Sequence, residues 1–123
     1  MNRALLAATI TLALPGTAFA QNDECTGAVA LTNGAPVAFD TTAATLSATP
    51  WPCASSTAPD LWYSYTPANT GVSVTFSTCG SSYDTALEVF GGTCTGLIPL
   101  DCNDDACGLQ STTALTSATA GQT

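Results

Sequence analysis

The stretch VSVTFS, at Val72–Ser77, gives the clearest indication of the fold. Val72, Val74 and Phe76 alternate with small hydroxyl side chains, so the apolar residues share one face of an extended chain. A turn sequence, PANTG at residues 67–71, comes directly before this stretch. We therefore predict a half-buried β-strand over Val72–Ser77.

Other short segments along the chain show strand-like patterns as well. The further strand candidates are residues 35–40, 60–66, 84–90, 97–102 and 112–116. Gly91 and Gly92 are expected to end the strand at 84–90, and residues 22–31 fit either one helical turn or a short strand. No window shows helical periodicity beyond one turn. The pattern predicts an all-β fold, an antiparallel β-sandwich of the jelly-roll kind.

The start of the chain, residues 1–20, has the organisation of a secretory signal peptide. A positive residue precedes an apolar run over residues 4–14, and Ala18 and Ala20 form an A-x-A cleavage site. The apolar run is shorter than the roughly 20 residues that a membrane-spanning helix needs. We expect cleavage after Ala20, secretion of the protein to the extracellular space or cell surface, and a domain formed by residues 21–123.

The end of the chain, residues 118–123 (ATAGQT), resembles a turn that leads into another strand. A sandwich that stops at a turn leaves one strand position empty. We expect the domain to be truncated at its C-terminus, as a fragment of a longer chain. The alternative is that the final strand comes from elsewhere.

The charge balance excludes several classes of function. The chain has nine acidic residues, one basic residue and no histidine, for a formal net charge of −8. The single base, Arg3, lies in the predicted signal peptide. Nucleic-acid binding requires cationic side chains, and histidine chemistry is impossible here. We therefore expect no nucleic-acid partner.

The cysteine content indicates a domain that depends on disulfides. The six cysteines are Cys25, Cys53, Cys79, Cys94, Cys102 and Cys107. An even number in an exported chain favours disulfide bonds, and the absence of a C-x₂-C pair disfavours a structural zinc site. Sequence alone does not fix the connectivity. The sequential order, Cys25–Cys53, Cys79–Cys94 and Cys102–Cys107, is the interpretation that we favour.

An acidic cluster is the strongest candidate for chemistry. Asp101, Asn103, Asp104 and Asp105 are close in sequence, and Asp84 lies nearby if the two segments share one end of the sandwich. These carboxylates repel one another without a cationic side chain, and calcium would relieve that repulsion. The spacing is similar to the start of an EF-hand loop, but the required glycine and helices are missing. We predict a calcium site from these five residues, with a solvated acidic turn as the alternative.

A catalytic interpretation has weaker support. Asp84 and Glu88 lie four residues apart in one predicted strand, and paired carboxylates can hydrolyse glycosides, with Asp105 as a further candidate. No serine has a histidine or lysine to activate it. The aromatic residues Trp51, Trp62 and the three tyrosines either stack on sugars or pack in the core. We expect no enzymatic activity.

One set of motifs occurs in an informative order. The motifs are residues 22–25 (NDEC) with Ala28, 60–65 (DLWYSY), 78–80 (TCG), 83–92 (YDTALEVFGG) with Cys94, 102–105 (CNDD) with Cys107, Ser111 and Gly121. Together they resemble the disulfide-bearing relatives of the bacterial pre-peptidase C-terminal domain, a β-sandwich module of secreted multidomain proteins. The resemblance spans nearly all of residues 21–123, and the order of the motifs makes it specific.

The resemblance implies a jelly-roll-like sandwich without catalytic residues and with a closing strand after Gly121. It places the family's acidic positions at Asp84 and at Asn103, Asp104 and Asp105. Members accompany secreted peptidases, and some related domains bind calcium or matrix polymers. A second similarity, through residues 83–92, is to CUB domains.

These observations predict a non-catalytic secreted β-sandwich module that is stabilised by calcium. It would serve adhesion, binding of an extracellular polymer or protein, or support of an adjacent secreted enzyme in a longer chain. A small carboxylate-dependent secreted hydrolase and a CUB-like protein-interaction domain are the alternatives.

Overall fold

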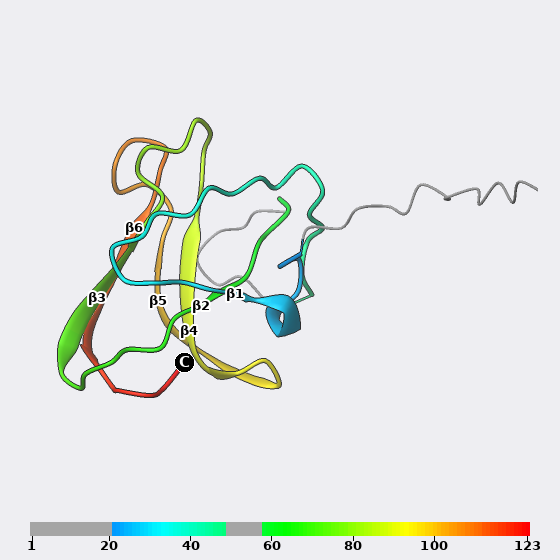
Figure 1. Ribbon diagram of the computed structural model, residues 1–123. Coiled ribbons are helices and arrows are strands. Elements are labelled where there is room, and N and C mark those ends of the chain that lie inside the picture. Colours follow the sequence, from blue (N-terminus) through cyan, green and yellow to red (C-terminus); the bar gives the residue numbers. More distant parts are fainter. Residues whose placement is uncertain (1–20, 49–57) are drawn as a thin grey trace, which may run out of the picture.

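The computed structural model describes residues 21–48 and 58–123. The predicted signal peptide, Trp51 and Cys53 lie outside the described residues. The described elements are η1 (Cys25–Gly27), a short 3₁₀ helix, and the strands β1 (Val29–Ala30), β2 (Tyr63–Ser64), β3 (Val72–Ser77), β4 (Leu87–Thr93), β5 (Gly96–Asn103) and β6 (Thr112–Ala118). The fold is all-β, as predicted, and its antiparallel strand pairs pack against one another (Figure 1).

Strand β3 has the bounds that the alternation predicts, and its residues are alternately half-buried and exposed. It pairs antiparallel with β6, where Phe76 lies opposite Thr113. Backbone hydrogen bonds from Gly71 to Ala118 (2.8 Å) and from Thr78 to Ser111 (2.9 Å) extend this pairing at both ends. The weaker prediction of a strand at 112–116 is confirmed, because β6 includes these residues.

Strands β4 and β5 form an antiparallel hairpin. The expectation that Gly91 and Gly92 end β4 is wrong, because the strand continues to Thr93 and the turn follows it. Gly92 has a φ of +99°, and a Cβ at this position would lie 2.4 Å from the Gly96 carbonyl oxygen. Glycine is therefore needed here because the two strands approach closely, not because the strand stops.

The N-terminal half contains less regular structure than predicted. Residues 22–31 form both alternatives in succession, η1 and then β1. Residues 35–40 are not a strand, and in the segment 60–66 only Tyr63–Ser64 is assigned as one. The pairing of β2 with β1 is parallel. The alternating sequence of residues 60–66 therefore does not correspond to a long hydrogen-bonded strand.

The disulfide connectivity is not sequential. Cys25 is bonded to Cys94, and Cys79 is bonded to Cys107, with Cα–Cα distances of 5.7 and 6.0 Å. The favoured order is therefore wrong for these four residues. Cys102 is also disulfide-bonded, so it does not pair with Cys107 as expected. The first bond attaches the N-terminal segment to the end of the β4–β5 hairpin, a contact between distant parts of the sequence that neighbouring cysteines do not indicate.

The interior of the described part is thin in apolar side chains. Among the described residues, the buried apolar side chains are Trp62, which is 8% exposed, and Pro67. The buried polar residues are Asn22, Asp23, Ser47, Ser111 and Thr113. Hydrogen bonds to Asn22, Asp23, Ser47 and Ser111 therefore supply order that a larger apolar core would otherwise supply, whereas the buried Thr113 hydroxyl has no partner.

Candidate functional site

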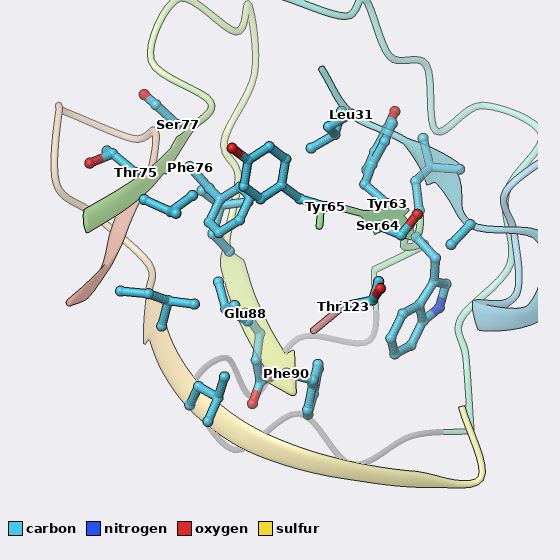
Figure 2. A pocket seen from close by; sticks show the side chains of 18 of the residues that line it. Leu31, Tyr63, Ser64, Tyr65, Thr75, Phe76, Ser77, Glu88, Phe90 and Thr123 are labelled. Atoms are coloured by element: carbon cyan, nitrogen blue, oxygen red, sulfur yellow. The ribbon is translucent and has the colours of Figure 1, made fainter. Parts of the chain in front are cut away.

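An open hollow of about 2070 Å³ lies among the strands. Figure 2 shows side chains that line it: Tyr63 and Tyr65 from β2 and the segment after it, Phe76 from β3, and Glu88 and Phe90 from β4. All five are only partly covered. This part of the wall therefore combines aromatic rings with the Glu88 carboxylate, and Asp60, Asp84 and Asp104 line the hollow elsewhere.

Two ring contacts hold this wall together. The rings of Trp62 and Phe90 stack with centroids 5.8 Å apart, and Tyr65 meets Phe76 edge to face at 5.9 Å. Contacts of this kind contribute about 0.5–1.5 kcal/mol each beyond the burial of area. They connect the segment around β2 to β4 in one direction and to β3 in the other.

Glu88 is unusual among the carboxylates of the described residues. Both of its side-chain oxygens are buried and have no hydrogen-bond partner. This loss of hydration raises the pKa of the Glu88 carboxyl. No basic residue follows Arg3 in the sequence, so residues 21–123 contain no side chain that could form an ion pair with Glu88.

Two of the predicted calcium ligands bind the protein backbone instead. The Asp101 carboxylate accepts a hydrogen bond from the Ala114 amide (3.0 Å), and the Asn103 side-chain oxygen accepts one from the Thr112 amide (3.1 Å). These two side chains lie two residues apart on β5, and they reach amides two residues apart on β6. They connect the β4–β5 hairpin to the β3–β6 pair.

The other three predicted ligands, Asp84, Asp104 and Asp105, are exposed. No hydrogen bond from a described residue to their carboxylates is seen. The hydroxyl of Ser111, which is 0% exposed, lies against the backbone carbonyl oxygens of both Thr85 and Asp104. The backbone after Asp84 is thereby brought beside the acidic turn.

These positions do not form a ready metal site in the described part of the chain. No group of three or more Asp, Glu, Cys or His side chains is gathered there in a way that could hold a metal ion. Asp101 and Asn103 each direct an oxygen to β6, so the five predicted ligands do not fit a single ion as one set. The donors that remain uncommitted are Asp84, Asp104 and Asp105.

The carboxylates of Asp23 and Asp60 order the N-terminal segment. The carboxylate of Asp23 accepts hydrogen bonds from the amide (2.5 Å) and hydroxyl (2.8 Å) of Thr45. The carboxylate of Asp60 accepts from the amide (2.6 Å) and hydroxyl (2.7 Å) of Ser47, and the indole N–H of Trp62 donates to the Ser47 hydroxyl (2.8 Å). Sequence reasoning did not assign this role, since the partners are 22 and 13 residues away from the acids.

The catalytic alternative assumed that Asp84 and Glu88 lie in one strand, and they do not. Strand β4 begins at Leu87, so Asp84 precedes the strand and does not share a strand face with Glu88. Asp84 is exposed, whereas the Glu88 oxygens are buried. The two acids therefore differ in exposure, although both line the hollow.

The part of the chain described by the structure contains no helix with the length and hydropathy of a membrane span. Comparison with protein-family models, with curated proteins and with solved structures gives no match. The arguments for function therefore rest on the residues and the geometry of this chain.

Proposed function

We propose that residues 21–123 form a secreted, non-catalytic β-sandwich module that binds an extracellular polymer or protein, or supports an adjacent secreted enzyme. The observation that carries the proposal is the open hollow lined by Tyr63, Tyr65, Phe76 and Phe90. Partly exposed aromatic rings around a concave surface are typical of binding sites. The resemblance to pre-peptidase C-terminal domains agrees with this role.

The use of the carboxylates supports a non-catalytic module. Asp23, Asp60 and Asp101 each accept hydrogen bonds from backbone amides of distant segments. An acid that is occupied in this way holds the fold and is poorly placed to exchange protons with a substrate. Disulfides that join distant segments agree with an extracellular location.

The hydrolase alternative is retained because of Glu88. A carboxyl with a raised pKa in a concave site is the usual form of a general acid. The secreted chain should be incubated with a panel of peptides and of glycans, and the products should be separated. We expect no cleavage. Cleavage that disappears in Glu88→Gln would contradict the proposed function and favour the hydrolase.

Calcium binding is proposed for Asp84, Asp104 and Asp105, whose carboxylates accept no hydrogen bond from a described residue; the three are not gathered around one point in the structure, so calcium would have to draw them together. Calcium at 100 times its dissociation constant should add about 2.7 kcal/mol to the free energy of unfolding. Thermal melting of the secreted chain in millimolar calcium and in EDTA measures the effect. Equal melting midpoints in the two buffers would contradict calcium binding and would favour the alternative, a solvated acidic turn.

A further inference from the structure

Glu88 lacks a cationic partner, and residues 21–123 contain no side chain that could provide one. A buried carboxylate without a hydrogen bond or counter-ion is costly, so the group either holds its proton or pairs with a cation. The Glu88 oxygens are in this state, and no Lys, Arg or His follows Arg3. A cation that pairs with Glu88 therefore lies outside residues 21–123.

The size of the hollow indicates what kind of molecule would supply the cation. Pockets for small molecules are usually about 300–1,000 Å³, and this hollow, at about 2070 Å³, is larger. Its lining includes residues from β2, β3 and β4 and from the last residues of the chain, such as Thr123 (Figure 2). An open site of this size fits an extended chain better than a compact ligand.

Strand β3 offers a place for the backbone of such a chain. Within the described residues β3 has one strand neighbour, β6, and its other edge has none. Thr75, Phe76 and Ser77 of β3 all line the hollow (Figure 2). An extended peptide can add to a strand edge of this kind through main-chain hydrogen bonds, with side-chain pockets providing specificity.

We propose that the hollow binds an extended segment of a partner polypeptide, and that a lysine of this segment pairs with Glu88. The inference rests on the proposed function as a binding module and names the class of its partner. The aliphatic stem of the lysine lies along the aromatic wall, and its ammonium group lies near Phe90 and the Glu88 carboxylate. Glu88 lines the hollow, and pairing requires its buried oxygens to turn toward the ligand.

The test uses the secreted chain and a short, end-capped peptide of alternating threonine and valine with one central lysine. A matched peptide carries norleucine, which keeps the aliphatic stem and removes the ammonium group. We expect the lysine peptide to bind about tenfold more tightly in isothermal titration, as a charge-assisted hydrogen bond implies. Equal affinities, or no binding of either peptide, would overturn the inference.

Variants of the chain test the role of Glu88 itself. Glu88→Gln should remove the preference for lysine over norleucine, while Glu24→Gln should keep it. Glu24 is exposed and does not line the hollow, so it provides the same chemical change at a neutral position. A preference that survives in Glu88→Gln would contradict the proposed pair. The two peptides on the unchanged chain remain informative if this variant does not fold.

Two control ligands distinguish a polypeptide partner from a small amine and from a polysaccharide. Butylamine presents the same ammonium group without a backbone, and competition by butylamine at the concentration of the peptide would contradict a polypeptide partner. Tight binding of an uncharged polysaccharide with no binding of the lysine peptide would contradict it as well. Cleavage of the peptide would contradict the proposed non-catalytic function, whereas equal binding of the two peptides would contradict only this inference.

Discussion

The N-terminal segment and the four longer strands are ordered by different interactions. Strands β3 to β6 are held by antiparallel ladders, with β5 and β6 also connected through Asp101 and Asn103. The N-terminal segment has only the two-residue strands β1 and β2, and it is held by carboxylates that bind amides far along the chain. Acidic side chains thus replace backbone ladders in the region where ladders are short.

The largest expected effect comes from separating the two regions covalently. Cys25→Ser with Cys94→Ser removes a bond that spans 69 residues and should lower the free energy of unfolding by about 4 kcal/mol. Removal of Cys79–Cys107, which spans 28 residues within the strand region, should cost about 3.5 kcal/mol. Denaturant unfolding measures both values. A larger loss for the second pair would contradict the importance of the N-terminal attachment.

A smaller effect is expected from one carboxylate of the N-terminal segment. Asp23, which is 9% exposed, accepts two hydrogen bonds from Thr45, and Asp23→Ala leaves these donors without a partner. The expected loss is about 2 kcal/mol in the free energy of unfolding, measured by denaturant titration. The neighbouring exposed Glu24→Ala is the control and should change stability by less than about 0.5 kcal/mol. Equal effects of the two variants would contradict the structural role of Asp23.

The smallest structural effect is expected where β5 meets β6. Asp101→Ala or Asn103→Ala removes a single acceptor and should cost about 1 kcal/mol. Hydrogen exchange should become faster at the Ala114 amide in the first variant and at the Thr112 amide in the second. Unchanged exchange at both amides would show that the side chains do not connect the strands, and would reopen them as metal ligands.

The strand region could largely be predicted from the sequence. Strand β3 follows from the alternation of Val72, Val74 and Phe76, because one face of the ladder is covered and the other is exposed. The continuation of β4 through Gly91 and Gly92 could not, because the need for glycine there comes from the approach of Gly96 in the partner strand. Alternation of apolar and polar residues indicates which side chains are buried, and it says little about which strands pair.

The candidate site was predicted less well for a related reason. Asp101 and Asn103 belong to a sequence that suggests a metal loop, yet their partners are amides of β6, which only the fold brings near. The sequence offers Glu88 as a catalytic acid beside Asp84, and nothing local indicates that its oxygens are buried without a partner. Contacts between distant segments decide the role of each carboxylate here.

The central claim is that Glu88, unlike Asp23, stands without a partner until a cation arrives. Because burial raises its pKa above the ordinary value of about 4.5, the folded chain holds this proton more tightly than the unfolded chain. The corresponding stability is present below the ordinary value and is lost as the pH rises through the raised one. We therefore predict that Glu88→Gln matches the unchanged chain at acid pH and is more stable at neutral pH, while Glu24→Gln shows no such trend. Thermal unfolding of the three proteins between pH 3 and 8 measures this. A Glu88→Gln variant that is less stable than the unchanged chain at neutral pH would show that Glu88 already has a partner, and would contradict the account.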